Sequence, residues 1–252
     1  RGCPVSVSVY EGNTADSVTL LPQVKRVREV FGIDTVVIVG DRGMISKKSI
    51  EQMRELEAVS WITALRSVQI RPLLDEGSLQ LGLFDERNLF EFTHPEFPGE
   101  RLIACRNTQL AKLRAHKRRE LLEATAVELQ KVRAMVERKT LRGSDRIGLR
   151  VGRVINKYKV AKHFEIAIDA HRFAFHIREE AVISEAALDG IYILRTSLAA
   201  REMDSAQVVR SYKSLSQVER AFRSIKTVDL TVRPIHHRRA DRVRAHIFLC
   251  ML

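Results

Sequence analysis

In the first 65 residues, segments whose apolar residues have the spacing of a strand alternate with segments whose apolar residues have the spacing of a helix. Apolar and small polar residues alternate over 5–10, which is the pattern of a half-buried strand. Over 18–31 the apolar side chains recur every three or four residues, so a helix is expected, preceded by an Asp16 or Ser17 cap. The order continues with a strand over 35–40, a helix over 46–58 and a strand over 60–65. This order predicts an α/β layer with parallel neighbouring strands.

The pattern changes from about residue 66 to residue 183. A long charged helix is predicted from Thr108 to Lys139, because leucines and valines recur along it at helical spacing. Short apolar alternations predict strands around it, over 79–84, 89–93, 101–106, 154–160, 163–169 and 172–177. We interpret this part as an insertion that is β-rich and contains one long helix.

After the insertion the chain returns to the pattern of its first part. A buried-type strand is predicted over 189–197, followed by helices over 205–214 and 216–227, a basic turn and a last apolar helix. The predicted domains are therefore a first core part, an insertion and a second core part, over 1–65, 66–188 and 189–252.

The net charge of the chain predicts a polyanionic partner. Lys and Arg number 43 against 31 Asp and Glu, which gives a net charge of +12. Such an excess favours nucleic acid ahead of a membrane surface, although a merely basic enzyme would share it. The three cysteines are odd in number and far apart, so they form neither a disulfide framework nor a zinc pattern, and a reducing cytosol fits. No apolar run is long enough to cross a bilayer.

Asp41 follows directly after the predicted strand over 35–40. The carboxyl ends of central parallel strands are where open α/β sheets bind ligands. An Asp in an ordinary strand-to-helix turn is the simpler alternative. The neighbouring Arg42 favours the first interpretation, since an Asp–Arg pair can hold a metal and a phosphate together.

Glu219 lies in a basic helix, and its helical face also carries Tyr212, Phe222, Arg223 and Lys226. A surface ion pair with Arg223 is the simpler explanation of this carboxylate. The aromatic residues nevertheless suggest a partly buried face, where a carboxylate needs cations or a metal. Together with Asp41, Glu219 could hold one or two Mg²⁺ ions for phosphoryl transfer. Two carboxylates are sparse for such a site, so a third is expected.

Two further basic runs lie over 112–119 and 233–246. Either run could contact a DNA backbone, or it could be a solvated helix face. The histidines of the second run have a spacing that fits no common metal site.

The segment YKSLSQVERAFRSIK, residues 212–226, resembles the Tyr-Arg-Glu-Lys signature of bacterial insertion-sequence transposases of the DDE class. Tyr212, Glu219 and Lys226 match its Tyr, Glu and Lys, whereas Leu215 stands at the Arg position. The segments EGNTADS and VIVGDRGM also resemble the part of that family which leads to its second catalytic Asp. The match places that Asp at Asp41.

The resemblance implies a ribonuclease-H-like catalytic core interrupted by a β-rich insertion. It assigns Asp41 and Glu219 as catalytic residues and ligands of Mg²⁺ or Mn²⁺. The DNA-binding residues that it suggests are Arg42, Tyr212, Arg220, Arg223 and Lys226. The implied partners are double-stranded DNA, as inverted-repeat ends and as target, and a second copy of the chain in a homodimer. A cytoplasmic, nucleoid-associated bacterial protein is expected.

The family's first catalytic Asp lies on the first of three leading strands, and the alternation over 5–10 resembles the third. We therefore expect that Asp upstream of Arg1, in a chain that is a fragment and inactive alone. Two alternatives stay open: a non-catalytic remnant that binds DNA or dimerises, and a metal nuclease of the same fold that cuts without strand joining.

Overall fold

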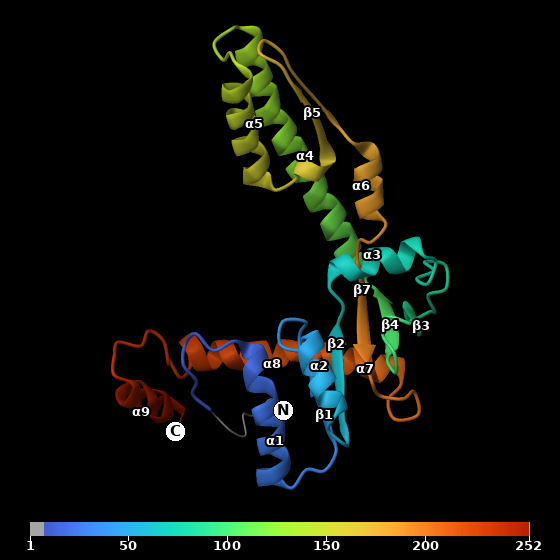
Figure 1. Ribbon diagram of the computed structural model, residues 1–252, viewed down its shortest axis with the longest axis vertical. Helices are drawn as coiled ribbons and strands as arrows, with labels where there is room; N and C mark the ends of the chain where they lie inside the picture. Colours follow the sequence, from blue (N-terminus) through green and yellow to red (C-terminus); the bar gives the residue numbers. More distant parts are fainter. Residues whose placement is uncertain (1–7, 252) are drawn as a thin grey trace. The chain divides into compact units, whose positions relative to one another are not determined.

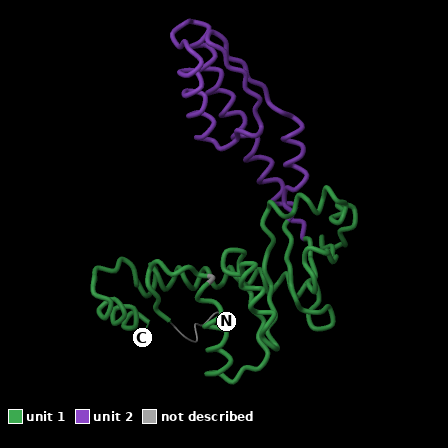
Figure 2. The backbone as a smooth tube through the Cα atoms, in the orientation of Figure 1, with its two compact units in different colours: residues 1–104, 192–252 green, residues 105–191 purple. Residues whose placement is uncertain are grey.

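The computed structural model describes residues 8–251. The chain divides into two compact units, which Figure 2 draws in different colours. Unit 1 comprises residues 1–104 and 192–252, and unit 2 comprises residues 105–191. The domain borders expected after residues 65 and 188 mark where an insertion enters and leaves the core. The division into compact units does not test them, so they remain predictions.

Unit 1 is built around one mixed sheet with helices, shown in Figure 1. The ends of β4 and β7 extend into residues that belong to unit 2. Its elements are α1 (Asp16–Phe31), β1 (Val36–Val39), α2 (Lys47–Arg54), β2 (Val59–Ala64), α3 (Ser67–Asp75), β3 (Leu89–Phe92), β4 (Arg101–Arg106), β7 (Ile191–Thr196), α7 (Ser205–Lys213), α8 (Leu215–Arg223), the π-helical segment η2 (Ser224–Val228) and α9 (Ala240–Met251).

The sheet has the strand order β1-β2-β7-β4-β3. Strands β1 and β2 pair in parallel, with Val36 opposite Val59, so the predicted parallel neighbours are confirmed for this pair. The next pair is antiparallel, with Ile62 opposite Thr196, and for β7 the sequence predicted a strand but no direction. A long segment separates β2 from β7, so the chain can return in either direction, and local sequence does not set that choice.

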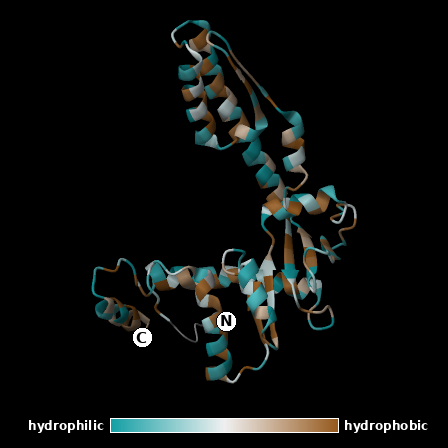
Figure 3. Cartoon of the chain, viewed as in Figure 1, coloured by the Kyte–Doolittle hydropathy of each residue, from teal (hydrophilic) through white to brown (hydrophobic). Residues whose placement is uncertain are grey.

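An apolar core joins α1 and α2 to strand β2. Leu20 and Val24 of α1 pack with Ile50 and Met53 of α2 against the buried ring of Trp61. Figure 3 shows the apolar colour following the strands of the sheet, while the helices alternate between apolar and hydrophilic turns. Each buried side chain of this size contributes roughly 1.5–3 kcal/mol. This packing holds the carboxyl end of β1, from which the candidate site begins.

The first predicted strand is not found in the described residues. Residues 8–10 have no strand structure, and residues 5–7 lie outside the described part of the chain. Ser8 instead contacts α1: its hydroxyl accepts hydrogen bonds from Gln23 at 3.2 Å and from Arg26 at 2.8 Å. The expected helix cap is also shifted, because Ala15 holds the cap position and Asp16 is the first helical residue.

A buried carboxylate ties several elements of unit 1 together. The Glu100 side chain is fully buried and lies 2.5 Å from two nitrogens of Arg195 in β7. It also accepts from Arg54 of α2 at 2.8 Å and from the indole nitrogen of Trp61 at 3.4 Å. Both carboxylate oxygens are therefore hydrogen-bonded, as a buried charge requires.

Unit 2 is mainly helical. Its long helix α4 and shorter helix α5 pack side by side and cover an antiparallel hairpin. Its elements are α4 (Thr108–Glu137), α5 (Ser144–Tyr158), the 3₁₀ turn η1 (Ala161–His163), β5 (Phe164–Ile168), β6 (Phe173–Ile177) and α6 (Glu179–Ala186). The predicted long helix is confirmed, with its end two residues earlier than expected.

The β-rich character expected for residues 66–188 was wrong. Residues 79–84 form no strand, and most of the predicted strand over 154–160 belongs to helix α5. Helices α3 and α6 were not predicted. In α5 the buried residues Ile147, Val151 and Ile155 recur every four positions, which is the helical period that decides the structure.

No helix within residues 8–251 has an apolar stretch of the length that a bilayer requires. The long helix α4 illustrates the reason, since basic and acidic side chains occur along its whole length.

Gly190 allows the chain to pass close to the first turn of α4. Its φ is +74°, and an added Cβ would overlap the carbonyl oxygen of Asn107 and lie 2.9 Å from the Cβ of Ala111. Gly190→Ala is therefore expected to lower the free energy of unfolding by about 2–3 kcal/mol, from backbone strain and displacement of the helix start. Urea unfolding measures this change.

The control for that substitution is Gly148→Ala in α5. Nothing lies within 4 Å of the added Cβ there, so alanine should stabilise the helix by up to about 1 kcal/mol. Equal effects of the two substitutions would contradict the assignment of Gly190 as a conformational requirement.

His163 of η1 is a buried histidine that contacts Glu185 of α6. The distance from its Nε2 to Glu185 Oε2 is 2.5 Å, and Lys162 Nζ lies 2.9 Å from the same oxygen. Burial raises the pKa of Glu185, but Lys162, His163 and Arg118 more than offset it and bring this pKa below its ordinary value. Glu185 thus stabilises unit 2 in its ionised form.

We expect Glu185→Gln to lower the free energy of unfolding at pH 7 by about 1 kcal/mol, limited by solvent screening because the side chain is 40% exposed. A carboxylate with a lowered folded pKa stabilises above its unfolded pKa, and this contribution is lost as the pH falls through the folded pKa. The difference between parent and variant should therefore narrow below about pH 4.5. Urea unfolding at pH 7 and pH 4 tests this, with Glu180→Gln on the same helix as control; a difference that is independent of pH would contradict it.

Candidate functional site

Asp41 forms a tight turn directly after β1. Its Oδ1 accepts the backbone N–H groups of Gly43 and Met44, each at 2.8 Å. Gly40 before it lies close to Ile45, whose Cγ1 would be 2.9 Å from an added Cβ. The turn is an Asx turn, which holds the exposed carboxylate in one orientation. Within residues 8–251 the second oxygen, Oδ2, has no hydrogen-bond partner, so it is available to a ligand.

Arg42 is exposed beside this carboxylate. In the described part of the chain no carboxylate lies within ion-pair distance of its guanidinium. A guanidinium without a carboxylate partner is available to phosphate.

Tyr212 lies at the end of α7, whose start is fixed by a capping box of Asp204 and Gln207. The helix ends at Lys213, and α8 begins at Leu215. The predicted break between two helices is thus confirmed. Tyr212 and Glu219 therefore belong to successive helices, α7 and α8, which Figure 1 shows joined end to end.

The phenol of Tyr212 lies within electrostatic range of both segments. Its pKa is raised first by burial and then by the negative charges of Asp41 and Glu219, while the positive charge of Arg42 acts in the opposite direction. These charges act on one half-buried phenol, although Asp41 and Glu219 are far apart in sequence. The raised pKa keeps Tyr212 neutral at physiological pH, so it can donate a hydrogen bond.

Glu219 is exposed, as is Phe222, whose side chain retains 54% of its surface. The expected partly buried face is found at Tyr212 and Leu215, which are half-buried, but it does not extend to Glu219 and Phe222. The alternative ion pair with Arg223 is also absent within residues 8–251, where Glu219 has no cation within 4.0 Å. Its carboxylate is therefore accessible, and no protein group neutralises it.

The remaining predicted DNA-binding residues follow Glu219 along α8 and η2. Arg220, Arg223 and Lys226 are all exposed, and Lys226 Nζ lies 5.6 Å from the centre of the Phe222 ring. No hydrogen bond or ion pair in the described residues joins these cations to Asp41 or Glu219. They form a basic continuation of the site along the helix.

A metal site is supported only in part by these residues. Carboxylate oxygens are the donors that Mg²⁺ and Mn²⁺ prefer, and both carboxylates are accessible. Nowhere in residues 8–251 do three or more His, Cys, Asp or Glu side chains gather as metal ligands. The predicted third carboxylate is thus not found in the described part of the chain.

Sequence reasoning missed a second group of cations, on α5. Arg146, Arg150, Arg153 and Lys157 follow one another at steps of four, three and four residues. This spacing puts them on one helical face, and it was overlooked because residues 154–160 were interpreted as a strand. The helical period of the intervening apolar residues is the signal that could have found them.

The chain is thus an α/β protein with two candidate ligand carboxylates, an Asp at the end of a parallel strand and a Glu on a later helix, whose charges both act on one tyrosine. A family model described as the transposase DDE domain matches residues 1–252. The chain therefore belongs to the family of transposase DDE domains, and the resemblance to DDE transposases is confirmed. Its family is one of DNA transposition. Comparisons with curated proteins and with solved structures found no match.

Proposed function

We propose that the chain is the catalytic domain of a bacterial insertion-sequence transposase, which cleaves and joins DNA by metal-dependent phosphoryl transfer. The observation that supports this most directly is the phenol of Tyr212, which is affected by the charges of both Asp41 and Glu219. Carboxylate oxygens are the ligands that Mg²⁺ and Mn²⁺ prefer, and these two carboxylates come from distant parts of the sequence.

In this proposal Asp41 and Glu219 hold the ion through carboxylate oxygens. When bound, such an ion supplies an activated attacking oxygen and neutralises charge on the leaving oxygen. Asp41 is oriented for this role by the N–H groups of Gly43 and Met44. Tyr212 donates a hydrogen bond beside the carboxylates and positions the DNA strand.

The surrounding cations would bind the DNA backbone. Arg42 lies beside Asp41, and Arg220, Arg223 and Lys226 extend from Glu219 along the helix. Arginine binds phosphate through paired N–H groups, which fixes the strand relative to the carboxylates. The proposed partners are the inverted-repeat ends and target DNA, bound by a homodimer at the bacterial nucleoid. The proposed core has a ribonuclease-H-like arrangement.

A strand-cleavage and joining assay on inverted-repeat duplexes with Mg²⁺ tests the proposed function. It should be run on this chain and on forms that carry upstream residues. Joining of a 3′-end to target DNA supports a transposase, whereas cutting without joining supports the alternative of a metal nuclease. Cleavage that persists in excess EDTA would contradict both.

The number of carboxylates favours a second candidate, a DNA-binding domain that is catalytically incomplete. No group of three or more candidate ligands is found among residues 8–251. Such a domain would bind inverted-repeat DNA without cleaving it, even with upstream residues added. The same assay, with a binding measurement beside it, separates the two candidates.

A further inference from the structure

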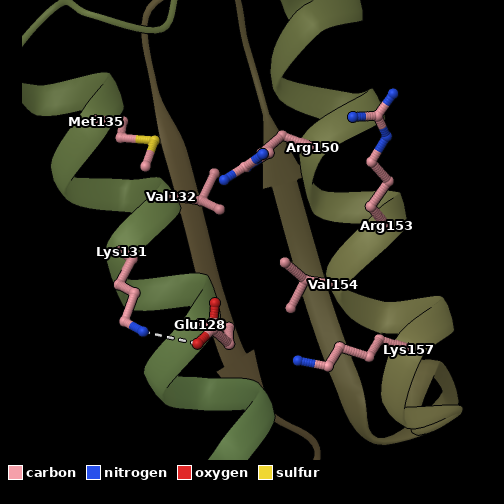
Figure 4. A pocket seen from close by; sticks show the side chains of 8 residues that line it. All are labelled: Glu128, Lys131, Val132, Met135, Arg150, Arg153, Val154 and Lys157. Carbon is pink, nitrogen blue, oxygen red and sulfur yellow. Dashed lines mark hydrogen bonds and ion pairs between the residues drawn. The ribbon is translucent and has the colours of Figure 1, made fainter.

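A charged groove runs between helices α4 and α5 of unit 2, and Figure 4 shows it from close by. The two helices are held together beneath it by buried apolar residues, among them Leu129 and Val132 of α4 and Val151 and Ile155 of α5. Because this packing holds both helices in place, the backbone positions of the residues at the rim of the groove are fixed. The groove is therefore a formed surface of unit 2.

The rim of the groove is strongly basic. Four cations line it, Lys131 from α4 and Arg150, Arg153 and Lys157 from α5, against the single carboxylate of Glu128. Glu128 pairs with Lys131 at 2.7 Å, and in Figure 4 Arg150 and Lys157 extend from α5 toward α4. Lys131 first, and then the charges of Lys157 and Arg150, lower the pKa of Glu128.

The three α5 cations have no carboxylate of their own. Within the described residues no Asp or Glu oxygen lies within 4.0 Å of Arg150, Arg153 or Lys157. The carboxylate of Glu128 is already paired with Lys131. The positive charge on this side of the groove is therefore uncompensated and is available to an anion from outside the chain.

The cations form a line rather than a point. With Arg146, one turn earlier, they span twelve residues of α5, and the eleven steps between the first and the last correspond to a length of about 16 Å at 1.5 Å per residue. One strand of duplex DNA carries a phosphate about every 3.4 Å along the axis, so the line matches the rise of roughly five base pairs. A single small anion would leave most of these charges without a partner.

We propose that the groove between α4 and α5 binds the phosphodiester backbone of duplex DNA without reading its sequence. This inference rests on the proposed function, to which it adds a DNA contact on unit 2. The residues that line the groove include no aromatic ring that could stack on a base and no side-chain amide that could read a base edge. Its volume of about 200 Å³ is smaller than the roughly 300 Å³ at which pockets for small organic ligands begin.

The test compares the full chain with the triple variant Arg150→Gln, Arg153→Gln, Lys157→Gln. Binding to a labelled 30-base-pair duplex of arbitrary sequence is followed by fluorescence anisotropy between 50 and 300 mM KCl. Each lost phosphate contact lowers the slope of log K against log salt by about 0.9, so we expect a decrease of roughly 2–3 and at least a tenfold loss of affinity at 100 mM. A change of duplex sequence should leave these values unaltered.

Two controls separate the groove from overall charge. The triple variant Arg133→Gln, Arg138→Gln, Arg172→Gln removes the same charge from exposed cations of unit 2 that do not line the groove, and should weaken binding less than threefold. Glu128→Gln removes the one carboxylate at the rim and should tighten binding, which is the opposite sign. Thermal unfolding confirms that every variant is folded.

The inference is overturned if both triple variants weaken binding equally, or if the groove variant binds as tightly as the parent. Its failure is distinguishable from failure of the proposed function, because the latter is read from cleavage and joining. Groove-dependent binding without metal-dependent cleavage would contradict the proposed catalysis and support the groove. If the parent cleaves DNA but its binding does not depend on the groove, the proposed catalysis is supported and the groove inference is contradicted.

Discussion

In a form of the protein that cleaves DNA, Glu219→Gln is expected to lower metal-dependent cleavage at least a thousandfold, while binding of the DNA changes little. Gln has nearly the same shape but lacks the negative charge that holds a divalent ion, so the loss falls on the chemical step. A thousandfold decrease corresponds to about 4 kcal/mol of activation free energy. Because Glu219 is exposed and has no ion pair in the described residues, the substitution should leave folding stability unchanged.

Asp41→Asn should lower cleavage to the same extent, because it too removes a negative charge. The turn around Asp41 allows this effect of charge to be separated from an effect on folding. The amide oxygen of Asn can still accept the N–H groups of Gly43 and Met44, so the turn is preserved. A loss of activity without a loss of stability would then be attributable to the charge. Glu29→Gln, an exposed glutamate on α1, is the matched control and should behave as the parent.

Binding of Mn²⁺ gives a readout of these variants that does not depend on cleavage. Electron paramagnetic resonance of a Mn²⁺ titration should show the parent binding about tenfold or more tightly than Glu219→Gln or Asp41→Asn. Cleavage and Mn²⁺ binding that are unaffected by both substitutions would show that the two carboxylates are structural, and the assignment of the site would be wrong.

The second large effect is expected at Glu100. Glu100→Gln should lower the free energy of unfolding by about 3–5 kcal/mol, because it leaves two arginines beside a neutral group in a buried site. Arg195 has only 13% of its side chain exposed, so its guanidinium would remain buried without a counterion. Arg54 is 39% exposed and can turn to solvent, which places most of the loss on Arg195.

Unfolding in urea, followed by tryptophan fluorescence, measures this effect at the site itself. The chain has one tryptophan, Trp61, and its indole nitrogen donates to Glu100. The control is Asp75→Asn in α3, which removes the exposed partner of the exposed Arg71 and should cost less than about 1 kcal/mol. If both substitutions lower the free energy of unfolding equally, burial of Glu100 and Arg195 does not increase the contribution of their ion pair to stability.

The parts of the fold that follow from local pattern were predictable. The long helix α4 and the strands over β1 and β2 have clear apolar periods, and the structure places them within a few residues of the expectation. Helix α5 was misjudged because β-branched Val154 and Ile155 near its end resemble a short strand, and because glycines at 148 and 152 weaken the helical signal. Packing against α4 overrides both local preferences.

The candidate site shows the same division between local and long-range information. The strand end predicted a position for Asp41, and the signature over residues 212–226 predicted Glu219. That the charges of both act on one phenol depends on the packing of segments that are distant in sequence, so no local pattern contains it. The exposure of Glu219 and Phe222 also depends on what the neighbouring elements leave uncovered, so the predicted partial burial holds only for Tyr212 and Leu215.

The π-helical segment η2 changes what the spacing between Glu219 and Lys226 means. In an α-helix each residue turns the chain by about 100°, and seven residues make nearly two full turns. A π-helical turn contains one more residue than an α-helical turn, so side chains beyond Arg223 lag behind the direction that α-helical counting would give them. The seven-residue interval between Glu219 and Lys226 therefore contains an angular offset, and in the proposed DNA complex the two side chains would face different parts of the strand.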